Sequence, residues 1–159
     1  NGLRACVQGM AELEGERICS TRIRELLAEG NLPLAQAMLG HAFTIDGEVE
    51  QGQKLARQLG FPTANMRVMP NAALPPAGVY KIQSWVDDEL CHGIANLGIR
   101  PTIDEAQKVM RLETHLTDWQ GNLYGRRMQV EILRFLRPEK RFGSVEELRA
   151  QIVADVQML

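Results

Sequence analysis

The spacing of apolar residues changes near Phe43, from a helical period to a period of two. Before that point, the segments 20–30 ("STRIRELLAEG") and 31–40 ("NLPLAQAMLG") each place apolar side chains on one helical face and end in glycine. Ser20 and Thr21 are suited to cap the first helix, and an asparagine is suited to cap the second. After Phe43, short alternating runs are separated by turn residues. The chain is therefore predicted to begin with two helices and to continue as short β-strands.

Five or six short strands are predicted, and their tight turns favour antiparallel pairing. Asp46-Gly47 lies inside the first run and is a hairpin or bulge signal, while Asp87-Asp88 separates two later strands. The last run places four apolar side chains on one side, interrupted only by Arg134: Met128, Val130, Ile132 and Leu136. Such strands predict a closed antiparallel barrel or a sandwich.

A helix is predicted at the end of the sequence. Ser144 and Glu147 in "SVEELRAQIVADVQML" form an S-x-x-E capping box. The segment carries an apolar stripe that should lie on the barrel, formed by Val145, Leu148, Ile152, Val156 and Leu159.

Composition limits the partners to be expected. The 159 residues are 45% apolar and 24% charged, which suits one ordinary domain with a buried core. The formal net charge is -2 without a block of like charges, and no apolar run approaches the roughly 20 residues of a membrane span. Neither nucleic acid nor a membrane is therefore an expected partner. Three cysteines without C-x-x-C spacing argue against a disulfide framework or a zinc site, and they favour a cytoplasmic location.

The common glycine-based phosphate signatures do not occur: there is neither G-x-x-x-x-G-K-[ST] nor G-x-G-x-x-G. Instead, "PTAN" at 62–65 sets a hydroxyl and a carboxamide two residues apart. Because Pro and Asn are turn formers, its simplest interpretation is a loop. The preceding segment 47–60 is rich in glycine and carries two cations, which suits close approach to phosphates. Neither segment defines a function by itself.

Glu113 has two interpretations, and the pattern leaves both open. Three polar residues alternate with Leu112, Thr114 and Leu116, so they share one face of a strand: Arg111, Glu113 and His115. If that face meets solvent, Glu113 is an ordinary surface charge. If that face lines a cleft, the carboxylate could accept a proton from a substrate.

Taken together, these segments resemble the riboflavin kinase family. The resemblance covers 39–159 and rests on "GFPTAN", "GIANLGIRPT", "LETHL" and "LRPEKRF", in that order and spacing. It implies a mainly β fold, namely a six-stranded antiparallel Greek-key barrel with a C-terminal helix packed on it. It also implies that ATP phosphorylates the ribityl 5′-hydroxyl of riboflavin, giving FMN and ADP. The alternative is a non-catalytic flavin- or nucleotide-binding barrel, and the oligomeric state stays open.

The resemblance also assigns roles to individual residues. Thr63 and Asn65 would hold Mg²⁺ beside the ATP phosphates, and Glu113 would be the catalytic base. ATP itself would be bound by the loop and by "PTAN", through Gly52, Arg57, Gly60, Pro62 and Thr63. Arg137 and Phe142 would belong to a flap that closes over nucleotide and flavin. Ala56 stands where the family usually has glycine, and a left-handed backbone there would cost on the order of 1 kcal/mol.

A second resemblance concerns the first segment. "ICSTRIR" at 18–24 is similar to the signature that closes the adenylyltransferase module of bifunctional family members, with Cys19 where serine is usual. The remnant of that motif would consist of Ser20, Thr21 and Arg24. The predicted organisation is the end of a truncated α/β nucleotidylyltransferase domain with linker helices at 1–38, followed by the kinase barrel at 39–159. FMN would become FAD only in the absent module.

Overall fold

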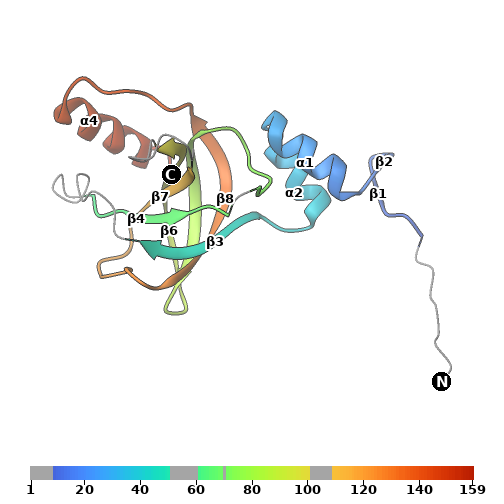
Figure 1. The fold of residues 1–159 in the computed structure, drawn as a ribbon, viewed down its shortest axis with the longest axis horizontal. Helices are drawn as coiled ribbons and strands as arrows, with labels where there is room; N and C mark the ends of the chain where they lie inside the picture. The colour runs from blue at the N-terminus through green and yellow to red at the C-terminus, as the bar shows by residue number, and fades with distance from the viewer. Residues whose placement is uncertain (1–8, 51–60, 70, 101–108) are drawn as a thin grey trace.

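The barrel lies between two helical attachments, α1 and α2 on one side and α4 on the other (Figure 1). The computed structural model describes residues 9–50, 61–69, 71–100 and 109–159. The elements in chain order are β1 (Glu12–Leu13), β2 (Glu16–Arg17), α1 (Ser20–Glu29), α2 (Leu32–Leu39), β3 (Phe43–Glu50), β4 (Ala64–Arg67), β5 (Gly78–Val86), β6 (Glu89–Arg100), β7 (Val109–Leu116), β8 (Arg127–Arg137) and α4 (Val145–Val156). No helix within the described ranges is long and apolar enough to cross a membrane.

The six barrel strands pair in the order β3-β4-β7-β6-β5-β8, and β8 pairs with β3 to close the barrel. All six pairings are antiparallel. Strands β5, β6 and β7 are successive neighbours, whereas β4 lies beside β7 and β8 lies beside β5, which is a Greek-key arrangement. The predicted six-stranded Greek-key barrel is confirmed, and the sandwich is excluded.

The two acidic turn signals have different outcomes. Asp87 and Asp88 take φ angles of 50° and 67° and form the turn between β5 and β6, as predicted. Asp46 and Gly47 form neither a hairpin nor a bulge, because both lie inside β3 in unbroken register with β8. That prediction is wrong because pairing along the whole strand outweighs a local turn preference.

The predicted alternation along β8 holds only for the first half of the strand. Three side chains there are buried in the barrel core: Met128, Val130 and Ile132. Beyond Ile132 the register with β5 shifts twice, which leaves Leu133 and Leu136 without directly paired residues. Leu136 is therefore half-buried instead of continuing the buried row, and that part of the prediction is wrong. Such β-bulges are not apparent from an apolar pattern.

Helices α1 and α2 bury their apolar residues as predicted. Five of their side chains are buried within the main core cluster, namely Leu26, Leu27, Leu32, Ala35 and Met38. Gln36 Nε2 donates to the carbonyl of Ile132 at 3.0 Å, which connects α2 to β8. The pair of helices is thus anchored to the barrel by both apolar burial and a hydrogen bond.

The ends of these helices confirm most of the expected signals. Gly30 and Gly40 take φ angles of 79° and 75° at the two C-termini. Asn31 Oδ1 accepts from the backbone of Leu34 at 3.4 Å, as an N-cap does. The predicted Ser20 and Thr21 cap is wrong: Cys19 is the N-cap residue, and it makes no side-chain capping bond. The helix begins at Ser20, so both hydroxyls lie beyond the capping position.

Helix α4 is less deeply buried than its apolar stripe predicts. Ser144 Oγ accepts from the backbone of Glu147 at 3.2 Å, so the predicted N-terminal cap is present. The stripe is half-buried at Leu148, Ile152, Val156 and Leu159, whereas Val145 is 41% exposed. The buried residue of α4 is Asp155, whose two oxygens accept from Arg137 at 2.8 and 2.7 Å. This ion pair attaches the helix to β8.

Candidate active site

Three polar side chains form one row across β4, β7 and β6. Asn65 pairs with Glu113, and Glu113 pairs with Asn96 on its other side. Directly paired residues have Cβ atoms roughly 4.5–5.5 Å apart on one face of a sheet. The chain neighbours of these three residues are buried, so the row faces away from the barrel core: Ala64, Met66, Ala95, Leu97, Leu112 and Thr114. We refer to Asn65, Glu113 and Asn96 as the Glu113 row.

The two carboxamides of the Glu113 row carry oxygens without partners. Asn65 Oδ1 and Asn96 Oδ1 are buried and have no hydrogen-bond partner within the part of the chain that the structure describes. Burying an unpaired polar group costs roughly 1–3 kcal/mol, so such groups are rare unless a ligand or water supplies the partner. Glu113 is half-buried between them. Glu113 therefore lies between two unsatisfied amide oxygens, and its role as a base stays a prediction.

Two arginines border the Glu113 row. Arg111 Nη1 donates to Glu50 Oε2 at 2.9 Å, and Arg67 Nε lies 3.6 Å from Glu50 Oε1. Arg111 is two residues from Glu113 on the same strand, so its side chain emerges on the same face. The sequence placed Arg111 beside Glu113 but gave no sign of the bond to Glu50, which depends on the pairing of β3, β4 and β7. Glu50 thus holds both arginines beside the Glu113 row.

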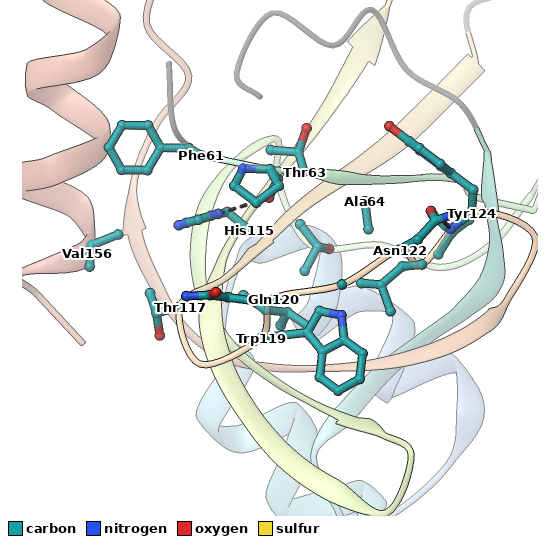
Figure 2. A pocket seen from close by; sticks show the side chains of 16 residues that line it. Phe61, Thr63, Ala64, His115, Thr117, Trp119, Gln120, Asn122, Tyr124 and Val156 are labelled. Atoms are coloured by element: carbon teal, nitrogen blue, oxygen red, sulfur yellow. Dashed lines mark hydrogen bonds between the residues drawn. The ribbon is translucent and has the colours of Figure 1, made fainter. Parts of the chain in front are cut away.

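The "PTAN" segment is held against β7. The imidazole of His115 donates from Nδ1 to the carbonyl of Pro62 at 3.0 Å (Figure 2). The same ring meets Phe61 edge-on, with centroids 5.3 Å apart. Thr63 lies one residue before β4 and two before Asn65. Because side chains alternate along an extended chain, Thr63 and Asn65 point to the same side. The structure thus brings the predicted metal pair, Thr63 and Asn65, next to Glu113.

A cavity of about 590 Å³ opens at the adjacent rim of the barrel (Figure 2). Residues 61–64, the end of β7, most of the segment 117–124 and Val156 of α4 line it. Two buried polar atoms in its wall, Thr114 Oγ1 and Trp119 Nε1, lack hydrogen-bond partners in the described ranges. A mostly apolar wall with a few unpaired polar groups is typical of a small-molecule site.

One wall of the cavity is tied to β6 by Asp118. Its Oδ2 accepts from the backbone N–H of His92 at 3.3 Å, and its Oδ1 accepts from the hydroxyl of Thr117 at 3.1 Å. The backbone hydrogen bond from His92 is the main cause that lowers the pKa of the Asp118 carboxyl below its usual value, with the Thr117 hydroxyl and the His92 side chain adding to it. The segment 117–124, which forms much of the cavity wall, is therefore attached to β6 near its start.

The predicted flap residues lie together, but next to α4. Arg137 pairs with Asp155, and its guanidinium carbon lies 6.0 Å from the ring centroid of Phe142. No described contact joins either residue to Glu113, so their role in ligand binding stays a prediction. Asp155 was not predicted from the sequence, because a helical pattern does not indicate that an acidic residue will be buried.

The remaining predicted residues fall outside this group. Ser20, Thr21 and Arg24 are exposed on α1, on the opposite side of the barrel from α4 (Figure 1). Three predicted ATP-binding residues, and Ala56 with them, lie outside the described residues: Gly52, Arg57 and Gly60.

The residues around Glu113 offer few ligands for a metal ion. Within the described ranges, no group of three or more His, Cys, Asp or Glu side chains could hold a metal. The donors beside Glu113 are the neutral oxygens of Thr63 and Asn65, and Asn65 Oδ1 is buried without a partner there. Mg²⁺ prefers oxygen ligands and usually takes one or two from the protein and the rest from phosphate and water. These residues fit a cation that arrives with a nucleotide.

Comparison with known proteins identifies the family. The family described as Flavokinase: Riboflavin kinase matches residues 39–159. The bifunctional riboflavin kinase/FMN adenylyltransferases of Pseudomonas fluorescens and Escherichia coli K12 are 46% and 43% identical over 145 and 142 residues. These alignments cover 91% and 89% of this chain, but the chain spans about half the length of these relatives, 46% and 44%. The chain belongs to the riboflavin kinase family.

Solved structures show the same fold. A crystal structure titled macrolide-efflux protein, from Streptococcus pneumoniae, superposes with a TM-score of 0.82 and 30% identity, over 94% of this chain and 48% of that one. A riboflavin kinase structure from Trypanosoma brucei gives a TM-score of 0.50 at 22% identity, over 72% of this chain and 75% of that one. The second likeness is one of fold alone.

Proposed function

We propose that this chain is a riboflavin kinase, which transfers the γ-phosphoryl group of ATP to the ribityl 5′-hydroxyl of riboflavin and releases FMN and ADP. The observation that supports it best is the pairing of Asn65 with Glu113 across β4 and β7. This pairing sets an unpartnered amide oxygen, suited to a metal-bound phosphate, beside a carboxylate suited to a hydroxyl proton.

In this proposal Glu113 is the catalytic base. A carboxylate is too weak a base to ionise an alcohol in advance. In the loose transition state of phosphoryl transfer, however, the proton can move late, and orientation of the hydroxyl matters more. Thr63 and Asn65 would hold Mg²⁺, which would offset the negative charge of the phosphates when bound.

The cavity at the barrel rim is proposed as the nucleotide site. Its apolar wall suits a purine ring, and it shares Thr63 with the proposed metal pair. The rest of the proposed ATP-binding set comes from the predicted loop and from "PTAN", namely Gly52, Arg57, Gly60 and Pro62. Arg137 and Phe142 are proposed to border the flavin, between the barrel and α4.

Residues 1–38 are proposed to correspond to the end of the adenylyltransferase half of the bifunctional relatives. Ser20, Thr21 and Arg24 would be the remnant of its motif, and the chain alone is then expected to make FMN and not FAD. A cytoplasmic location is proposed as well, and it is supported by the free thiols of Cys19 and Cys91.

The test is incubation with riboflavin, ATP and Mg²⁺, followed by chromatography of the flavins. FMN should accumulate in proportion to the protein, and chelation of the metal should stop it. Binding of riboflavin without FMN would instead support the non-catalytic alternative. FAD formed from added FMN and ATP, by protein free of host enzyme, would contradict the proposed division at residue 38.

A further inference from the structure

We propose that Asn96 is a substrate-positioning residue, whose Oδ1 accepts a hydrogen bond from a ribityl hydroxyl of riboflavin. The inference rests on the proposed riboflavin kinase function and adds to it a role for Asn96, which lies in the "GIANLGIRPT" segment but received no role from the resemblance. Its starting point is the place of Asn96 in the Glu113 row, paired directly with Glu113 across β6 and β7.

The orientation of the Asn96 amide is determined by Glu139. Asn96 Nδ2 donates to Glu139 Oε1 at 3.0 Å, and a carboxylate oxygen cannot donate in return. The nitrogen therefore faces Glu139, and Oδ1 is the atom left buried without a partner in the described part of the chain. An unpaired amide oxygen can only accept, so its ligand must offer an O–H or N–H group.

Glu139 also lies against Gly98, two residues from Asn96 on β6. A Cβ atom at Gly98 would lie only 2.0 Å from Glu139 Oε1, so the carboxylate occupies space that any other residue at 98 would fill. Glu139 follows β8, in the segment that leads to α4. The bond between Asn96 and Glu139 thus joins the Glu113 row to the segment that carries Phe142.

Riboflavin can supply the required donor close to Glu113, whereas the phosphates of ATP cannot. Phosphate oxygens only accept hydrogen bonds. Asn96 Oδ1 is also an acceptor, so it could not form a hydrogen bond with them. The ribityl chain carries hydroxyls on the carbons next to the reacting 5′-position, and that position must approach Glu113. A hydroxyl on a neighbouring carbon can therefore reach the residue paired with Glu113.

The decisive measurement is flavin affinity, which does not depend on turnover. Riboflavin and lumiflavin, which lacks the ribityl hydroxyls, are titrated against wild type and Asn96→Ala by flavin fluorescence. Loss of one hydrogen bond should weaken riboflavin binding about three- to tenfold and leave lumiflavin binding unchanged. Unchanged riboflavin affinity, or equal losses for both flavins, would overturn the proposal. A shift only in the Mg²⁺ needed for half-maximal rate would make Asn96 a metal ligand instead.

The Glu139 variants test how the amide is held. Glu139→Gln keeps an oxygen that can accept from Asn96 and should retain riboflavin affinity, whereas Glu139→Ala frees the amide and should weaken it severalfold. The matched control is Gln83→Ala, because Gln83 Nε2 donates to Glu131 Oε2 at 2.6 Å in a similar amide–carboxylate pair on β5 and β8. That variant should leave the affinity for both flavins unchanged.

Two further readouts separate the possible failures. Thermal unfolding of Asn96→Ala should be near that of wild type, because removal of an unsatisfied buried acceptor offsets the lost hydrogen bond to Glu139. A large drop in melting temperature with equal loss of both flavins would assign Asn96 a purely structural role. If wild type binds riboflavin with the expected dependence on Asn96 but makes no FMN, the proposed function fails and this inference stands.

Discussion

The two sides of the barrel differ in where unsatisfied polar atoms are buried. In the described ranges, four buried side-chain atoms lack hydrogen-bond partners, and all four lie on β4, β6, β7 or the segment after β7: Asn65 Oδ1, Asn96 Oδ1, Thr114 Oγ1 and Trp119 Nε1. On the side of α1 and α2, by contrast, polar groups are paired. Gln36 bonds to Ile132, and the hydroxyl of Tyr80 donates to the carbonyl of Pro76.

Because of this difference, we expect one side of the barrel to serve ligand binding and the other to serve stability. Unsatisfied groups lower stability unless a ligand completes them, whereas paired groups and buried leucines maintain the fold. Substitutions on the site side should therefore change catalysis with little loss of stability. Substitutions on the α1 and α2 side should do the reverse.

The largest expected effect is at Glu113. Glu113→Gln keeps the shape of the side chain but removes its ability to accept a proton, so turnover should fall by roughly 10²–10⁴-fold. Flavin affinity should be retained, and steady-state kinetics with a separate binding titration measure the two. Near-normal turnover would show that Glu113 is an ordinary surface charge and not the base.

The strongest effect on the other side is expected at Leu26, which is fully buried. Leu26→Ala should lower the free energy of unfolding by roughly 2–5 kcal/mol, because it removes buried apolar atoms and leaves a cavity. Urea denaturation measures this, with Leu90→Ala as the matched control, since Leu90 is 38% exposed. The specific activity of the folded fraction should not change. A loss of activity without a loss of stability would contradict the division between the two sides.

A smaller effect is expected at the proposed metal pair. Asn65→Ala and Thr63→Ala should each raise the Mg²⁺ concentration for half-maximal rate at least tenfold, which is about the effect of losing even an outer partner of a metal site. Stability should change little for Asn65→Ala, because the lost oxygen has no described partner. Titration of the rate with Mg²⁺ measures the effect. If either variant unfolds readily while its folded fraction stays fully active, the residue is structural.

A pH dependence of stability is expected at Tyr80. Burial raises the pKa of the Tyr80 hydroxyl from 10.0 to about 12, so the folded state favours the neutral form. The resulting stability is present below the unfolded pKa and is lost as pH rises from about 10 to about 12. Tyr80→Phe should lack this component, and the difference between the two unfolding curves isolates it from other titrating groups. Parallel curves for the two proteins would contradict the prediction.

Local sequence determined the features that depend on a few adjacent residues. Gly30 and Gly40 end their helices because a left-handed residue satisfies the last turn, and Asp87-Asp88 makes a hairpin turn for a similar reason. The alternation around Glu113 put its side chain on the face opposite Leu112 and Thr114, since successive side chains of a strand point to opposite sides. The six-stranded barrel and the candidate site residues were predicted from the resemblance to the riboflavin kinase family.

Tertiary structure decided everything that joins distant segments. Asn65, Glu113 and Asn96 meet only because β7 lies between β4 and β6, and no local pattern encodes that strand order. Asp46-Gly47 became part of a strand because its neighbours pair with β8, and Asp155 became buried because Arg137 reaches it from β8. Periodicity reports which face a side chain occupies. Which other chain segment that face meets is set by the closure of the barrel, through contacts between residues far apart in the sequence.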